Sequence, residues 1–225
     1  MDIIRLENTD PDDIMDILCR LEKSFGIRFG ENDFMHVDTF GDLCDVIEKS
    51  ISSEHRNDCT TQQAFYKVRN ALRQTIPDCV TVISPDTKLE DLFSRSDRAR
   101  LVRRFEKNLG VKVGVLSMQG WLSFVITLGF LASFVCLFLY LKVAVMGFLI
   151  FYLIVKLAKR AAKELAIETV GELTKKLTRE HYLFVRRSPC TVNLNEIFAV
   201  IQDVFSDYLS LDKQYLTRDA SLGWG

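Results

Sequence analysis

Apolar and polar residues are unevenly distributed along this chain of 225 residues. Between residues 121 and 155 the only charged side chain is Lys142, whereas the segments on either side are rich in Asp, Glu, Lys and Arg. A bilayer core of ~30 Å requires about 20 helical residues to cross it. Trp121–Leu141 supplies this length without a charge, so the pattern predicts a membrane segment between two polar regions.

A second apolar stretch, Val143–Val155, predicts a second pass and therefore a transmembrane hairpin over residues 121–158 with Lys142 at its turn. The alternative is one long tilted or broken helix, which would leave Lys142 inside the bilayer at a cost of about 3 kcal/mol or more. Basic residues flank both ends of the block and favour the cytoplasmic side. We therefore expect an integral protein of the bacterial inner membrane with both termini in the cytoplasm.

The polar segments contain amphipathic helices that recur along the chain. LEKSFGIRF (residues 21–29) matches FEKNLGVKV (105–113), and in both copies an apolar helix face ends at a glycine suited to a left-handed cap. TFGDLCDVI (39–47) matches TVGELTKKL (169–177), each a helix with threonine as its predicted N-cap. Phe65 to Asp86 and Phe198 to Asp219 form a third pair with equal spacing. Three pairs in consistent order predict a duplication.

The order of the matched pieces predicts the domain organisation. Residues 1–52 and 188–225 would form one unit from the two chain ends, and residues 58–120 and 163–183 would form a central unit. The apolar block lies between matched elements of the central unit, so it is interpreted as an insertion. Exchange of the end segments between two chains, giving a homodimer, would satisfy the same pattern.

Each predicted unit resembles the acyl carrier protein family. The resemblance rests on a helix, a long loop, a second helix of the form LE..FG[IV] and a short helix that begins TxG[DE]L. It implies an all-α fold of two small helical bundles plus the inserted hairpin. In that family a serine at the start of the second helix carries phosphopantetheine.

The modified serine is expected to be lost here, which implies no cofactor. Pro11 stands at the corresponding position of the end-assembled unit, and Arg95 stands there in the central unit. A shift of one residue would bring Ser96 into place, so attachment of phosphopantetheine to Ser96 is the alternative.

The second helices of the two units carry opposite charges. In the end-assembled unit, an acidic set at the start of this helix is a predicted surface for a protein partner: Asp10, Asp12, Asp13 and Asp16. In the central unit, a basic set on the corresponding helix is a predicted surface for membrane lipid or a partner: Arg98, Arg100, Arg103, Arg104 and Lys107. A simple solvated charged face is the plainer explanation of either set.

No catalytic motif or metal-binding spacing occurs, because the three histidines are scattered and the six cysteines include no CxxC pair. The net charge of −1 and the absence of interleaved aromatic residues argue against nucleic acid as a partner.

We therefore expect a membrane-anchored, noncatalytic, carrier-like interaction or scaffold protein at the cytoplasmic membrane face. The alternatives are an active acyl carrier modified at Ser96 that serves membrane-bound enzymes, and an immunity-type or regulatory membrane protein.

Overall fold

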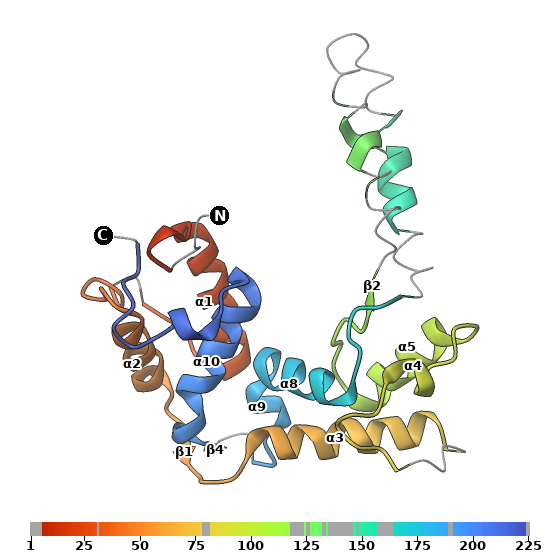
Figure 1. Cartoon of the computed structure of the whole chain (residues 1–225), viewed down its shortest axis with the longest axis horizontal. Helices are drawn as coiled ribbons and strands as arrows, with labels where there is room; N and C mark the ends of the chain where they lie inside the picture. The colour runs from red at the N-terminus through yellow and green to blue at the C-terminus, as the bar shows by residue number, and fades with distance from the viewer. Residues whose placement is uncertain are drawn as a thin grey trace. The chain divides into compact units, whose positions relative to one another are not determined.

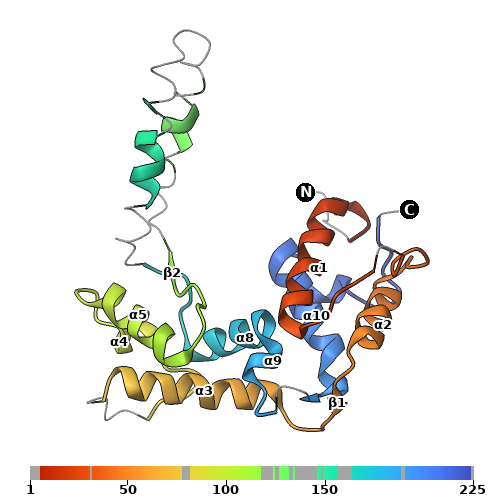
Figure 2. The same cartoon turned by 180° about the vertical axis from the view of Figure 1, so that it is seen from behind.

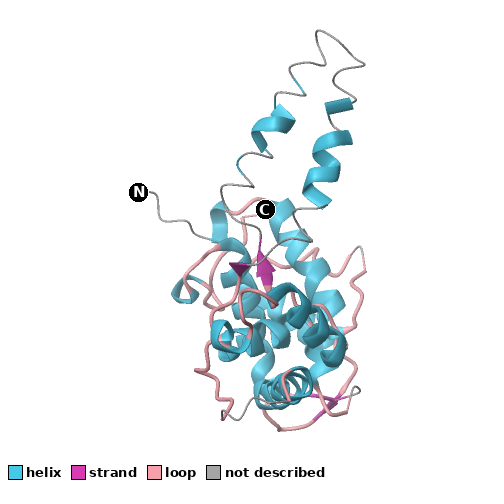
Figure 3. Ribbon diagram, turned by 90° about the vertical axis from the view of Figure 1, so that its right-hand side faces the viewer, coloured by secondary structure: helices cyan, strands magenta, loops and turns pink. Residues whose placement is uncertain are grey.

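The computed structural model consists mostly of helices, with a few very short strands (Figure 3). It describes residues 6–30, 32–77, 82–117, 124, 127–131, 134, 146–147, 149–156, 164–188 and 191–223. The chain divides into two compact units. Unit 1 combines residues 1–67 with 174–225, and unit 2 comprises residues 68–173.

Unit 1 is built around three helices from the two ends of the chain. Helix α10 (Leu194–Leu209) packs against both α1 (Pro11–Phe25) and α2 (Phe40–Ser50), as Figures 1 and 2 show. The apolar face predicted for the first helix is buried in this core, together with apolar residues of the other two helices. It comprises Ile14, Ile17, Leu18, Leu21 and Phe25. Full burial of such side chains stabilises the fold by about 1.5–3 kcal/mol each.

Shorter elements complete unit 1. They are the 3₁₀-helices η1 (Leu6–Asn8) and η2 (Lys213–Tyr215), helix α9 (Tyr182–Val185), and the strands β1 (Glu54–His55) and β4 (Thr191–Val192). The two strands pair in parallel, with Glu54 opposite Thr191.

Unit 2 contains the second part of α3 (Thr60–Thr75), α4 (Leu89–Leu92), α5 (Arg98–Leu109) and the start of α8 (Val170–Glu180). The rings of Phe93 and Phe105 lie 5.9 Å apart and join α5 to the end of α4. Asn108 Nδ2 donates to Thr75 Oγ1 at 3.0 Å and links α5 to α3. Strand β2 (Leu116–Ser117) pairs antiparallel with β3 (Glu164–Leu165).

The predicted helix ends are confirmed. Helix α1 ends at Gly26 (φ 61°) and α5 ends at Gly110 (φ 91°), both in the left-handed region that glycine adopts without strain. Thr39 caps α2 in a capping box with Asp42. Thr169 Oγ1 likewise accepts from the backbone of Glu172 at 3.1 Å, at the start of α8.

Each unit contains an equivalent hydrogen bond between the start of a helix and a loop. In unit 1 the amide of Gly41 donates to the carbonyl oxygen of Arg218 at 2.8 Å, and in unit 2 the amide of Gly171 donates to Pro85 at 2.7 Å. Isolated β-bridges accompany both contacts, Thr39 with Ser221 and Lys88 with Thr169. These residues correspond to one another in the repeat found in the sequence. The predicted division into two carrier-like domains stays a prediction.

The predicted transmembrane hairpin is wrong. Among the residues that the structure describes, no helix is both long and apolar enough to cross a bilayer. The longest described helical run in this region, residues 149–156, would extend ~12 Å at 1.5 Å per residue, against ~30 Å for a bilayer core. Most of the remaining hairpin residues, including the turn at Lys142, lie outside the described part of the chain.

Several predictions fall with the hairpin. The all-α class of two carrier-like bundles plus a membrane hairpin is corrected to a mostly helical chain with small two-stranded sheets. The inner-membrane location and cytoplasmic termini lose their basis. So do the predicted membrane-anchored scaffold and its two alternatives, because each assumed action at or in a membrane.

Candidate protein-binding surface on helix α1

Helix α1 presents one complete face to solvent in unit 1. Its buried positions follow the apolar helical period, so the intervening positions point outward. The exposed side chains on this face are Asp12, Asp13, Met15, Asp16, Cys19, Arg20 and Lys23. The cavities beside this exposed face include one that is mainly apolar and one that is charged.

The predicted acidic set lies together at the start of α1. Asp10 is the N-cap, and its Oδ1 accepts from the amide of Asp12 at 3.0 Å. Asp12, Asp13 and Asp16 follow on the first two turns and are exposed. The positive end of the helix dipole stabilises carboxylates here. The acidic set is therefore a stable, solvent-facing negative patch.

An apolar groove of about 640 Å³ lies next to this patch. Its apolar lining includes Met15, Leu18, Phe29, Phe34, Met35 and Val37. Met15 is 49% exposed and Met35 is 68% exposed, so both side chains offer apolar surface to solvent. Methionine side chains adapt their shape and are frequent at protein-binding surfaces. Sequence reasoning missed this groove, because Met35 lies in a loop without periodicity.

Two side chain to backbone contacts shape the loop that forms the groove's far wall. The amide of Phe29 donates to Glu22 Oε1 at 2.8 Å, and the amide of Gly30 donates to Asp33 Oδ2 at 2.7 Å. The rings of Phe29 and Phe34 meet edge to face at 5.0 Å. These contacts within the chain hold the loop in the conformation that forms one wall of the groove.

The second cavity, of about 410 Å³, is lined by charged side chains that pair with one another. Arg20 Nη1 donates to Tyr208 Oη, and its guanidinium carbon lies 4.2 Å from that ring's centroid. Arg179 forms an ion pair with Asp207 at 3.0 Å. Burial raises the pKa of Glu180 and also the pKa of Tyr208. The side chains that line this cavity bind one another, and their contacts connect α1, α8 and α10.

The basic set lies on α5, in unit 2. Arg98 Nε donates to the carbonyl oxygen of Phe93 at 3.1 Å, and Arg100 pairs with Asp97 at 2.9 Å. Arg103, Arg104 and Lys107 are exposed on the same helix. The structure therefore assigns the acidic and basic sets to separate units. The predicted action of the basic set on lipid stays a prediction.

Ser96 lies just before α5. Its hydroxyl is within 3.0 Å of Ser94 Oγ and 3.3 Å of Asp97 Oδ2, and the residue is exposed. Phosphopantetheine attachment there stays a prediction from the family resemblance.

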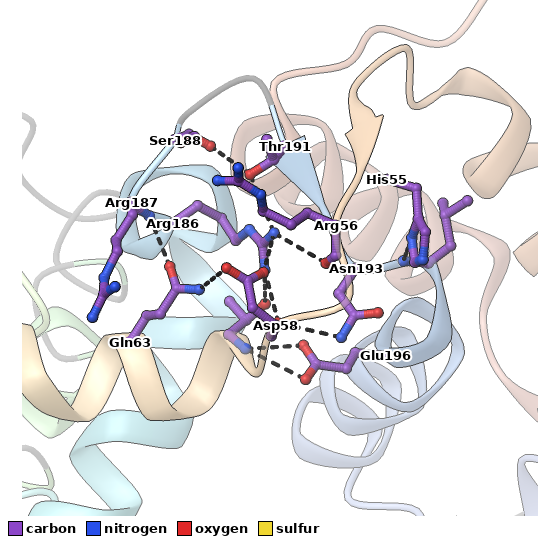
Figure 4. Close-up of polar contacts among 12 residues, drawn as sticks. His55, Arg56, Asp58, Gln63, Arg186, Arg187, Ser188, Thr191, Asn193 and Glu196 are labelled. Carbon is purple, nitrogen blue, oxygen red and sulfur yellow. Dashed lines mark hydrogen bonds and ion pairs between the residues drawn. The ribbon is translucent and has the colours of Figure 1, made fainter.

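A buried arginine, which sequence reasoning missed, organises the other end of unit 1 (Figure 4). The Arg186 side chain has no exposed surface, and its Nη2 lies 2.5 Å from Asp58 Oδ1. Nη1 donates to Thr60 Oγ1 and to the carbonyl oxygen of Asp58, both at 3.0 Å. Nη2 also donates to Thr191 Oγ1 at 3.1 Å. The protein's own acceptors occupy these donors, so Arg186 has a structural role.

Neighbouring contacts extend this network. Gln63 links two segments that are distant in sequence. Its amide nitrogen donates to Asp58 Oδ2 at 2.7 Å, and its amide oxygen accepts from the backbone amide of Arg187 at 2.7 Å. Glu196 accepts from the amide of Thr60 at 3.1 Å and satisfies the start of α3. Figure 4 shows Gln63 beside Asp58 and Glu196 at the start of α3.

The described residues contain no group of three or more His, Cys, Asp or Glu side chains that could hold a metal ion. Comparison of the chain with protein-family models, with curated proteins and with solved structures finds no significant match.

Proposed function

We propose that this chain is a protein-binding module whose exposed α1 face binds a basic surface of a protein partner. The observation that carries this proposal is the position of the exposed Met15 and Met35 beside the acidic patch of Asp12, Asp13 and Asp16. Apolar surface next to charges of one sign is typical of protein-interaction sites. The pairing of these two features supports binding rather than catalysis.

Lys and Arg side chains of the partner would contact both the acidic and the apolar part of this surface. Their charged ends would pair with the three carboxylates, and their long aliphatic stems would cover Met15. Exposed charge pairs contribute mainly to the rate and specificity of association, while the apolar contact contributes to the lifetime of the complex. A partner with a basic, partly apolar helix face fits both requirements.

A designed peptide tests this proposal. An 18-residue helical peptide of Lys, Leu and Ala is titrated into the full chain by calorimetry, with a Glu, Leu and Ala peptide as the control ligand. The Asp12→Asn, Asp13→Asn, Asp16→Asn variant should bind the basic peptide roughly tenfold more weakly, because three exposed pairs at about 0.5 kcal/mol each amount to about 1.5 kcal/mol.

A matched variant removes the same charge elsewhere in unit 1. Glu48→Gln, Glu54→Gln, Asp219→Asn changes three exposed carboxylates away from the α1 face and should leave the affinity unchanged. Met15→Ser, Met35→Ser should weaken binding while leaving its salt dependence in place. Equal losses in the α1 variant and the matched variant would show attraction to net charge alone and would refute the proposal.

A further inference from the structure

Two methionines are the most exposed of the large apolar side chains that line the groove beside α1. Met15 is 49% exposed and Met35 is 68% exposed, whereas Leu18 and Val37 of the same lining are buried. The two phenylalanine rings of the lining are only partly exposed. A partner that enters the groove therefore meets thioether groups first.

The two methionines belong to different walls of the groove. Met15 lies on α1, and Met35 lies in the loop that forms the far wall. Backbone hydrogen bonds fix this loop, because the amide of Met35 donates to the carbonyl oxygen of Asn32 and the amide of Val37 donates to that of Phe34, both at 3.3 Å. An apolar side chain of a partner that lies between the two walls contacts both methionines.

These methionines lie outside the apolar core of unit 1. The neighbouring positions Ile14, Ile17 and Leu18 are buried in that core, and neither Met15 nor Met35 is part of it. A chemical change at either sulfur atom therefore alters the surface of the groove and leaves the packing of the core intact.

We infer that Met15 and Met35 are modification sites at which a hydroperoxide reversibly weakens the binding of the basic partner. This inference rests on the function proposed above and adds regulation to the same site. Oxidants attack the thioether of methionine, and a sulfur atom that solvent reaches is the one that reacts. Both side chains meet this condition. The product, methionine sulfoxide, is polar where the thioether was apolar.

The reaction needs no group other than the sulfur atom and the oxidant. The sulfur lone pair attacks the terminal oxygen of the hydroperoxide, so that an S–O bond forms and the O–O bond breaks. The sulfur atom is oxidised by two electrons and the peroxide is reduced. The peroxide proton moves to the second oxygen, which leaves as an alcohol. Sulfoxide reductases reverse the change, with one enzyme for each sulfoxide epimer.

Sulfoxide formation should weaken only the apolar part of the contact. The new oxygen hydrogen-bonds to water, and this water must be given up when a partner covers the groove. The exposed carboxylates of Asp12, Asp13 and Asp16 do not react, so their charge pairs with the partner remain. The oxidised chain should bind the basic peptide roughly tenfold more weakly, with an unchanged salt dependence.

Calorimetry with the basic peptide of Lys, Leu and Ala tests the inference. The full chain is treated briefly with tert-butyl hydroperoxide and then with dithiothreitol, which restores reversibly oxidised thiols but not sulfoxides. Mass mapping should find one added oxygen on Met15 and one on Met35, and the melting temperature should not change. Treatment with the two sulfoxide reductases should restore the affinity of the reduced chain.

Two variants assign the effect to the groove. Met15→Leu, Met35→Leu keeps two apolar side chains without a sulfur atom, so its affinity should be the same before and after oxidation. The matched variant Met146→Leu removes a methionine of unit 2 that is 63% exposed, and it should lose affinity on oxidation as the wild-type chain does. An equal loss in Met15→Leu, Met35→Leu would overturn the inference. Unfolding on oxidation, or an absence of oxygen on both methionines, would also overturn it.

The reduced chain separates this inference from the proposed function. If the reduced wild-type chain binds the peptide through α1 and oxidation of both methionines has no effect, the proposed function stands and the control by oxidation is refuted. If the reduced Asp12→Asn, Asp13→Asn, Asp16→Asn variant binds the peptide as well as the wild-type chain does, the proposed function is refuted and the inference falls with it.

Discussion

The amide of Gly41 donates a hydrogen bond of 2.8 Å to the carbonyl oxygen of Arg218, which joins the start of α2 to the C-terminal loop. The equivalent bond in unit 2 runs from Gly171 to Pro85 at 2.7 Å. A Cβ at position 41 would lie 2.7 Å from the Arg218 oxygen, and one at position 171 would lie 3.0 Å from the Pro85 oxygen. Both positions require glycine because a backbone atom approaches so closely.

Replacement of these glycines should therefore destabilise the chain despite the better helix propensity of alanine. Gly41→Ala should lower the free energy of unfolding by about 1–3 kcal/mol, because the backbone must shift to relieve the clash. Gly171→Ala should cost less, since its contact is longer. Urea denaturation measures both effects. Gly30→Ala is the control, because its nearest neighbour is the flexible Asp33 side chain at 3.3 Å; a loss of stability there equal to that of Gly41→Ala would contradict the steric explanation.

The buried Arg186 should be far more important for stability than its neighbour Arg187. Arg186→Met removes the buried member of an ion pair and should cost about 2–3 kcal/mol, because Asp58, which is 37% exposed, and the hydroxyl groups of Thr60 and Thr191 lose their donor. Arg187→Met should change the stability little, since that residue is exposed. Chemical denaturation of the two variants provides the comparison, and equal stability losses would show that the network is dispensable.

Glu180 should make the stability depend on pH. Burial is the main cause that raises its pKa above the ordinary value, and Lys176, at 3.7 Å, offsets this only in part. Because its pKa is raised in the folded state, the protonated Glu180 side chain contributes fully to the free energy of unfolding below the unfolded pKa of about 4.3. It is lost as the pH rises through the higher folded pKa.

The variant Glu180→Gln should consequently be more stable than the wild-type chain at pH 7. The difference should shrink as the pH falls below about 4.3, where the wild-type carboxyl becomes protonated in both states. Thermal unfolding at a series of pH values measures this difference. A variant that is less stable at pH 7 would show that the ion pair with Lys176 outweighs burial.

The described cysteines should react with alkylating agents at very different rates. Cys19 and Cys59 are exposed, whereas Cys44 is buried, which raises its pKa to about 12. Because the thiolate is the reactive form, Cys44 should stay unmodified in the native chain at pH 8. Mass mapping after brief iodoacetamide treatment gives the pattern.

The same reaction reports on the proposed surface. Cys19 lines the apolar groove beside α1, so saturating basic peptide should slow its alkylation, whereas Cys59 should react as before. Equal protection of both thiols would indicate nonspecific coating. Unchanged reactivity of Cys19 would place the peptide elsewhere.

The sequence by itself determined the local structure of the helical parts of this protein. The apolar period of residues 14–25, the glycines at 26 and 110 and the threonine caps at 39 and 169 appear as predicted, because each depends on neighbours within one or two turns. The acidic and basic sets could also be read directly, since residues close in sequence share one helix face.

Tertiary structure alone decided the remaining features. Residues 58, 60, 186 and 191 meet around one guanidinium only because the chain folds back, and nothing in the local pattern distinguishes Arg186 from Arg187. The groove depends in the same way on a loop that brings Met35 beside Met15. The transmembrane prediction was based on hydropathy, which measures composition over a window, whereas crossing a bilayer requires one continuous helix of sufficient length, and the described residues include no such helix. Local periodicity reports burial and capping, and contacts between distant segments depend on the packing of the whole unit.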